Sequence, residues 1–200
     1  MKLYLENGYT SLNKKGEELC GDKVECVVDG EYTTMVLADG MGSGVKANIL
    51  STLTSKILCT MVSNGIDMDE CIATIVSTLP VCKVRGVAYS TFSVIHVDKQ
   101  GKGFLFEFDN PAAIYYHRGK CCDFDRDEHA YAGKTIYVTR LNLEEDDVII
   151  IMSDGVIHAG IGQLLNFGWL RSDVMKYLDE EIKPEMSARC IACLLASACN

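Results

Sequence analysis

The chain has 200 residues, a formal net charge of −9 and 48% hydrophobic residues. This length suits a single domain, 1–200, with a core of ordinary size, and the apolar content together with only three prolines excludes a disordered chain. The acidic balance argues against nucleic acid or an anionic membrane as the main partner.

The N-terminal sequence and the cysteines indicate a cytoplasmic protein. Residues 1–7 do not combine a charged segment with an apolar core, so we expect no signal peptide. No apolar run approaches the roughly 20 residues needed to cross a bilayer. The ten cysteines are scattered, so we expect most to be reduced thiols. Cys190 and Cys193 are expected to be buried on a helix rather than to bind zinc.

The first predicted elements are a hairpin and two helices. Strands at 24–28 and 32–38 flank Asp29-Gly30, which predicts a hairpin with a type I′ turn. A helix is expected over 45–64, with Ser43 as its N-cap and Asn64-Gly65 as its left-handed end. Its expected apolar stripe consists of Val45, Ile49, Leu50, Leu53, Ile57, Leu58, Met61 and Val62. A second helix is expected over 68–79, with Pro80 closing it.

Strand patterns dominate the rest of the chain until two final helices. The expected strands are 87–97, 103–109, 112–118, 134–139 and 148–153, and the expected helices are 172–182 and 186–199. Asp109-Asn110-Pro111 reads as a hairpin turn. This order of elements predicts an α+β fold of two antiparallel sheets covered by helices.

Two of the predicted strands run into Asp-Gly. Asp39-Gly40 follows the second strand, and Asp154-Gly155 follows the last one. A strand-terminal aspartate supplies a hard oxygen ligand, and the glycine leaves its carbonyl free to turn outward. Asp22, at the start of the first strand, is a third candidate. We therefore hypothesise a carboxylate cluster that binds metal and performs hydrolysis, although an isolated Asp-Gly pair is usually only a turn.

Four segments, taken in order, resemble the metal-dependent protein phosphatases of the 2C type, and more narrowly the branch typified by stage II sporulation protein E. They are Gly-Asp at 21–22, Leu-Ala-Asp-Gly-Met-Gly-Ser-Gly-Val-Lys-Ala at 37–47, Phe-Asp-Asn-Pro-Ala at 108–112 and Met-Ser-Asp-Gly-Val at 152–156. The resemblance implies a four-layer αββα sandwich of two antiparallel β-sheets flanked by helices.

The resemblance also implies two Mn²⁺ or Mg²⁺ ions between the sheets. It assigns Asp39 to both ions, the Gly40 carbonyl and Asp22 to one of them, and Asp154 to the other. Asp22, Asp39 and Asp154 are thus the expected catalytic residues. Two metal ions about 3.5–4 Å apart activate a water for attack on phosphorus and screen the phosphoryl charge.

The function that this resemblance implies is a serine/threonine protein phosphatase. Such enzymes hydrolyse phosphoserine or phosphothreonine on proteins, and those of the bacterial branch often act on small regulators of sigma factors. An anti-sigma-factor antagonist-like regulator is therefore the expected kind of phosphoprotein substrate. The residues do not name that substrate or choose between Mn²⁺ and Mg²⁺.

The chain departs from the family pattern at its C-terminus. Family domains continue into a final strand preceded by an acidic pair, whose first carboxylate completes one metal site. This chain ends at Asn200 without a matching pair after Asp154. We therefore expect a domain that lacks this strand, with the last ligand either beyond Asn200 or lost, and with weak activity. A regulatory domain outside the chain is a further expected partner.

Two other functions are consistent with parts of the sequence. The first is a catalytically silent relative that uses the same fold as a regulatory binding module. The second is a nucleotide-binding loop at Gly40-x-Gly42-x-Gly44. That loop lacks the Gly-Lys-Ser/Thr ending of a P-loop and the glycine spacing of a dinucleotide fingerprint, which argues against it.

Overall fold

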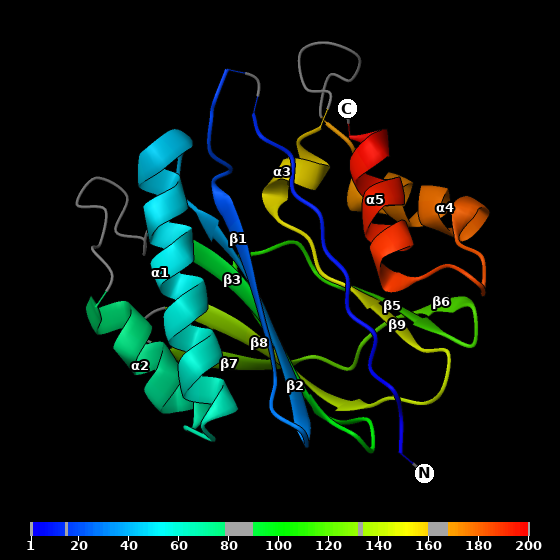
Figure 1. The fold of residues 1–200 in the computed structure, drawn as a ribbon, viewed down its shortest axis with the longest axis horizontal. Coiled ribbons are helices and arrows are strands. Elements are labelled where there is room, and N and C mark those ends of the chain that lie inside the picture. Colours follow the sequence, from blue (N-terminus) through cyan, green and yellow to red (C-terminus); the bar gives the residue numbers. More distant parts are fainter. Residues whose placement is uncertain (1, 15, 79–89, 132–133, 160–167, 200) are drawn as a thin grey trace.

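A computed structural model describes residues 2–14, 16–78, 90–131, 134–159 and 168–199. It contains two antiparallel sheets that face each other, with helices on both outer sides (Figure 1). The predicted four-layer αββα sandwich is therefore confirmed. Within these ranges, no helix has the length and apolar character needed to cross a membrane.

The first sheet has six strands in the order β1-β2-β3-β4-β8-β7. Two helices, α1 and α2, cover its outer face (Figure 1). The strands are β1 (Asp22–Val28), β2 (Tyr32–Gly40), β3 (Ser90–Asp98), β4 (Lys102–Phe108), β7 (Asp127–Tyr131) and β8 (Lys134–Asn142), and the helices are α1 (Gly44–Ser63) and α2 (Met68–Thr78).

The second sheet is small, with three described strands in the order β6-β5-β9. Two C-terminal helices, α4 and α5, cover its outer face, and the short helix α3 follows β9 (Figure 1). These elements are β5 (Ile114–His117), β6 (Lys120–Cys122), β9 (Val148–Ile150), α3 (Asp154–Ile157), α4 (Arg171–Glu181) and α5 (Ala188–Ala198). The expected strands and helices did not include β6, β7 or α3, because such short segments carry little periodic signal.

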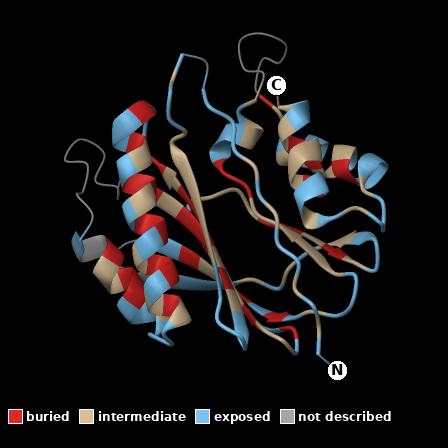
Figure 2. Cartoon of the chain, in the orientation of Figure 1, coloured by how far each residue is buried: buried red, intermediate tan, exposed pale blue. Residues whose placement is uncertain are grey.

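Three groups of apolar residues hold the layers together, and Figure 2 shows buried residues concentrated where the layers meet. The first group joins α1 and α2 to the large sheet and includes Val36, Leu58 and Phe92. The second joins α4 and α5 to the small sheet. The third fills the space between the sheets and includes Val97 and Leu105. Each sheet is therefore fixed on its inner and its outer face, which makes it a firm support for side chains at its ends.

The apolar stripe predicted for helix α1 is confirmed only in part, because Leu50, Leu58 and Val62 are buried and Ile57 and Met61 pack against the core, whereas three members of the stripe are not buried. Val45, Ile49 and Leu53 are 63%, 52% and 47% exposed. The buried residues of the helix are Gly44, Ala47, Leu50, Ser51, Thr54, Ser55, Leu58, Cys59 and Val62. Small and hydroxyl side chains let the helix approach the sheet closely, and the buried hydroxyls bond to carbonyls of their own helix, as Thr54 Oγ1 does to Leu50 at 2.9 Å. The predicted end is confirmed, because Gly65 adopts φ +74°.

Three local predictions are wrong or lie outside the described residues. The β1–β2 hairpin is present, but its turn is not the predicted type I′. That turn needs a positive φ at both Asp29 and Gly30, and only Gly30 has one. The cysteines in the described ranges are free, as expected, although Cys190 is exposed and Cys193 only half-buried. Pro80 and the start of the strand predicted at 87–97 lie outside the described residues.

Candidate metal centre

Two of the predicted acidic residues lie side by side where the β1–β2 hairpin opens. Asp22 begins β1 and is the cross-strand partner of Asp39, near the end of β2. Residues directly opposite each other in an antiparallel pair project from the same face. That face looks toward the second sheet, because Ile95, on the same face of β3, belongs to the core between the sheets.

Asp154 comes to this place from the second sheet, as the first residue of α3. The residue before it, Ser153, is buried and donates a hydrogen bond from Oγ to Oδ2 of Asp22 at 2.6 Å. The start of β1, the N-terminus of α1 and α3 all lie at one end of the sandwich, at the top of Figure 1. The site is thus assembled from both sheets, and the serine joins residues 131 positions apart.

The three carboxylates act on one another electrostatically. Burial, followed by the charges of Asp22 and Asp154, raises the pKa of Asp39 to about 8. Burial also raises the pKa of Asp22; the hydrogen bond from Ser153 opposes this shift, whereas the charge of Asp154 adds to it. Effects of this kind require short separations between the groups. The structure therefore brings together Asp22, Asp39 and Asp154, as the sequence predicted.

No lysine or arginine forms an ion pair with these carboxylates among the described residues. A histidine does lie near one of them: Nε2 of His158 is 3.9 Å from Oδ2 of Asp154. Within the same residues, no group of three His, Cys, Asp or Glu side chains has ready metal-binding spacing. Repelling carboxylates without a cation nevertheless fit a hard divalent ion, because such ions prefer carboxylate oxygens and would remove the repulsion.

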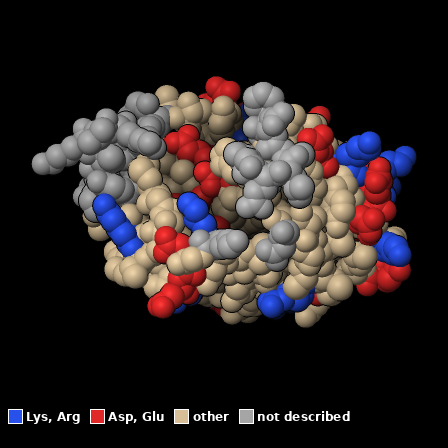
Figure 3. Space-filling model, turned by 90° about the horizontal axis from the view of Figure 1, so that it is seen from above, with Lys and Arg blue, Asp and Glu red and all other residues tan. Residues whose placement is uncertain are grey.

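The same end of the molecule is hollowed. Figure 3 looks down on it and shows a depression near the middle, with acidic side chains and some basic ones near its rim. An open depression of this kind gives a substrate access to groups that are only partly buried. Asp154, with 60% of its side chain exposed, is the most accessible of the three carboxylates, since Asp22 and Asp39 are half-buried.

At Gly40 the large sheet lies very close to the backbone of α1. A Cβ atom there would stand 2.0 Å from the backbone oxygen of Ala47, so no other residue fits without moving the helix. Ser43 is the N-cap of α1 by position, but its side chain makes no capping bond to the helix. Its hydroxyl donates instead to Oε1 of Glu17 at 2.8 Å, so the predicted capping bond is wrong.

The segment Asp109-Asn110-Pro111 is not the predicted hairpin turn. It lies between β4 and β5, which belong to different sheets, so it carries the chain across the sandwich. Asp109 adopts φ +54°, a conformation that aspartate tolerates better than most residues. The hairpin interpretation failed because turn residues look alike whether the next strand joins the same sheet or another.

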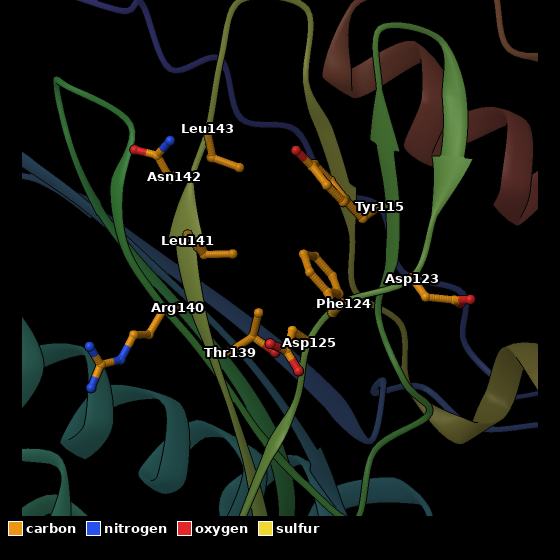
Figure 4. A pocket seen from close by; sticks show the side chains of 9 residues that line it. All are labelled: Tyr115, Asp123, Phe124, Asp125, Thr139, Arg140, Leu141, Asn142 and Leu143. Carbon is orange, nitrogen blue, oxygen red and sulfur yellow. The ribbon is translucent and has the colours of Figure 1, made fainter.

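A separate pocket of about 230 Å³ lies away from these carboxylates, between β8 and the segment around β5 (Figure 4). Tyr115 and Phe124 stack within it, with ring centroids 4.9 Å apart. None of the predicted site residues lines this pocket, whose walls are Tyr115, Asp123, Phe124, Asp125, Thr139, Arg140, Leu141, Asn142 and Leu143. We therefore place the candidate site at the carboxylates and not here.

Sequence reasoning assigned no role to Ser153, although it stands directly before Asp154. Its hydrogen bond to Asp22 depends on how the two sheets face each other, which no local pattern reports. Its place directly before a candidate ligand, at the end of an apolar run, was the one signal available in the sequence.

Comparison with known proteins settles the family. A family model described as Stage II sporulation protein E (SpoIIE) matches residues 29–196. The chain belongs to this family. The SpoIIE resemblance stated from the four segments is therefore confirmed, whereas no curated protein sequence matches the chain.

Solved structures with the same fold include PP2C phosphatase domains. The SpoIIE PP2C phosphatase domain from Bacillus subtilis, with a fragment of its regulatory domain, superposes with a TM-score of 0.76 at 20% identity, over 100% of this chain and 59% of that one. The chain thus spans about three fifths of that relative's length. RsbX in complex with magnesium gives a TM-score of 0.62 at 20% identity, covering 93% of this chain and 83% of that one. A serine/threonine phosphatase from S. agalactiae gives 0.64 at 14% identity, covering 97% and 94%.

Proposed function

We propose that this SpoIIE-family domain is a metal-dependent serine/threonine protein phosphatase. In this proposal a metal-activated water hydrolyses phosphoserine or phosphothreonine on a regulatory protein, and the protein works in the cytoplasm. The observation that carries the proposal is the meeting of Asp22, Asp39 and Asp154 from two sheets. The pKa of Asp39 is raised by burial and by the charges of the other two, and no lysine or arginine among the described residues pairs with the three carboxylates.

The residues present fit two divalent cations, Mn²⁺ or Mg²⁺. Asp39 would contact both ions, Asp22 and the Gly40 carbonyl would complete one site, and Asp154 would serve the other. When bound, the ions supply Lewis acidity and a water of lowered pKa. RsbX, a relative with the same fold, was solved with magnesium, which supports a divalent ion of this class.

The chain's own residues would prepare the site for such ions. Ser153 holds one oxygen of Asp22 by a hydrogen bond of 2.6 Å, which leaves the other oxygen for a ligand. Gly40 lets the N-terminus of α1 approach the end of β2. The free N–H groups at a helix N-terminus favour an anion, so a phosphoryl group near this end would be stabilised.

The proposed substrate is a phosphorylated regulatory protein of the anti-sigma-factor antagonist kind. Two structures of the same fold support a signalling role. One contains the RsbU and RsbW domains of Rv1364c from Mycobacterium tuberculosis, and the other was described with the bacterial stressosome as a modular system adapted to control secondary messenger signaling. A net charge of −9 makes nucleic acid a poor alternative partner.

A silent regulatory binding module is the second candidate. It is favoured by one observation, namely that the described residues form no group of three ligands with ready metal-binding spacing. Such a module would keep the fold and its partner but hydrolyse nothing.

One assay separates the two candidates. The metal-free chain is given p-nitrophenyl phosphate or a phosphothreonine peptide, with Mn²⁺, with Mg²⁺ or with EDTA. We expect hydrolysis with a divalent ion and none with EDTA. Failure to hydrolyse either substrate at any Mn²⁺ concentration, in a chain that is folded and binds Mn²⁺, would support the silent module instead.

A further inference from the structure

The connection between the two sheets is held rigidly at its second end. Glu107, which is 1% exposed, accepts a hydrogen bond from the backbone N–H of Ala113 at 2.6 Å. Arg171 of α4 donates to the carbonyls of Ala112 and Ala113 at 3.0 and 2.9 Å. Two elements from different layers therefore fix the chain just after Asn110-Pro111, so the position of Asn110 is well defined.

The side chain of Asn110 then bonds to the inner face of β3. Its Oδ1 accepts from Thr91 Oγ1 at 2.6 Å, and its Nδ2 donates to Ser93 Oγ at 3.0 Å. Thr91 and Ser93 are alternate residues, so both project from one face of the strand. The amide is used at both ends, with its oxygen as acceptor and its nitrogen as donor, which sets its orientation.

Thr91 is the direct cross-strand partner of Asp39. Directly opposite residues of an antiparallel pair have Cβ atoms about 4.5–5.5 Å apart, so the Thr91 side chain stands beside the carboxylate. Ser90, the residue before Thr91, also holds Asp39, because its Oγ donates a hydrogen bond to the Asp39 backbone carbonyl at 2.9 Å. The start of β3 thus determines where the end of β2 lies.

We propose that Asn110 is a positioning residue for the metal centre, which acts on Asp39 through Thr91. The hydrogen bond from Thr91 fixes the rotamer of this threonine and commits its proton to the amide, so its oxygen is left as an acceptor beside Asp39. Loss of the bond frees Thr91 to rotate against the carboxylate. The inference depends on the proposed metal-dependent function. It gives the segment between β4 and β5 a role in holding Asp39, beyond connecting the two sheets.

Variants of the two partners test this role. Thr91→Val and Asn110→Ala each remove the bond, and Thr91→Ser keeps the hydroxyl. Thr139→Val is the matched control, since Thr139 is also on the inner face of the large sheet and buried, with a hydroxyl that has no described hydrogen-bond partner. Mn²⁺ binding is measured by calorimetry without substrate, alongside thermal unfolding and the kcat and KM for p-nitrophenyl phosphate.

We expect Thr91→Val and Asn110→Ala each to weaken Mn²⁺ binding about tenfold, as is typical when a partner of a metal ligand is removed. The double variant should lose no more than the worse single variant, because both changes break one interaction. Thr91→Ser and Thr139→Val should bind Mn²⁺ as the parent does. With saturating Mn²⁺, KM should be unchanged in every variant.

The inference is overturned if folded Thr91→Val and Asn110→Ala bind Mn²⁺ within about twofold of the parent, or if their effects add in the double variant. It is also overturned if Thr139→Val loses as much affinity, since the cause would then be general to the sheet. An unmodified chain that binds Mn²⁺ but hydrolyses nothing would refute the proposed function and leave this inference to be judged by the binding data.

Discussion

Asp147 and the cluster of Asp22, Asp39 and Asp154 differ in the groups that surround their carboxylates. Asp147, whose side chain is 1% exposed, accepts hydrogen bonds from the Tyr115 hydroxyl at 2.7 Å and from the Glu144 N–H at 2.8 Å, and its Oδ1 is 2.7 Å from Nδ1 of His117. Asp22 and Asp39, by contrast, lie beside each other and near Asp154, so their neighbours include other carboxylates.

The difference shows which group serves the fold and which is available for a ligand. Donors surround Asp147, so its charge is stabilised without help from outside the chain. The cluster of Asp22, Asp39 and Asp154 has little such compensation, since burial raises the pKa of Asp39 first and the charges of Asp22 and Asp154 raise it further. A fold keeps such repulsion only where something else is gained, and a bound divalent cation is the partner that these oxygens prefer.

The largest expected effect is on turnover in Asp39→Asn. This change removes the charge that would contact both ions, so we expect phosphatase activity with Mn²⁺ to fall at least about a hundredfold. The chain should stay folded, because the repulsion with Asp22 is relieved. Asp147→Asn, the same chemical change outside the site, is the control. Activity of Asp39→Asn within a few-fold of the parent would contradict the proposed role.

Asp147→Asn should have the opposite effects, with a loss of stability but no loss of Mn²⁺ binding. It removes a buried charge that accepts several hydrogen bonds, so we expect the free energy of unfolding to fall by about 2–4 kcal/mol. Mn²⁺ affinity, measured well below the melting temperature, should not change. Urea unfolding with calorimetry decides this, and a loss of Mn²⁺ binding as large as in Asp39→Asn would remove the distinction between the two sets of carboxylates.

The third and smaller effect is the pH dependence of stability without metal. The folded pKa of Asp39, about 8, lies above its ordinary value of 3.8, so the folded chain keeps a proton that the unfolded chain releases between these values. The contribution of Asp39 to stability is therefore present at low pH and lost as the pH rises to 8.

We expect the metal-free melting temperature to fall between pH 5 and pH 8 by on the order of 5 °C more in the parent than in Asp39→Asn. Adding Mn²⁺ at pH 8 should raise it again in the parent only. Equal pH slopes for the parent and the variant, recorded by differential scanning calorimetry, would mean that Asp39 is not held among repelling charges.

Much of this architecture could be predicted from the sequence. The helices that begin at Gly44 and Met68, and the long strands of the large sheet, follow strong apolar periodicity and clear end signals. The three aspartates were found because Asp-Gly at the end of an apolar run is a local pattern. Their meeting follows from the β1–β2 register and from the position of β9 in the second sheet.

What the sequence could not predict depends on contacts between layers. The buried face of α1 was predicted only in part. Val45 and Ile49 look like core residues in the sequence, but the close approach of the helix at Gly40 turns small residues such as Ala47 toward the sheet. The crossover at Asn110 looked like a hairpin, since its bonds to Thr91 and Ser93 appear only once the strands are placed.

The most direct test of the paired-carboxylate site is an anomalous difference map from crystals soaked with Mn²⁺. We expect two peaks about 3.5–4 Å apart, with Asp39 in contact with both and with Asp22 and Asp154 on opposite sides. Manganese bound only elsewhere, or its absence from the space between these three side chains in an ordered crystal at saturating Mn²⁺, would contradict the metal centre and the function built on it.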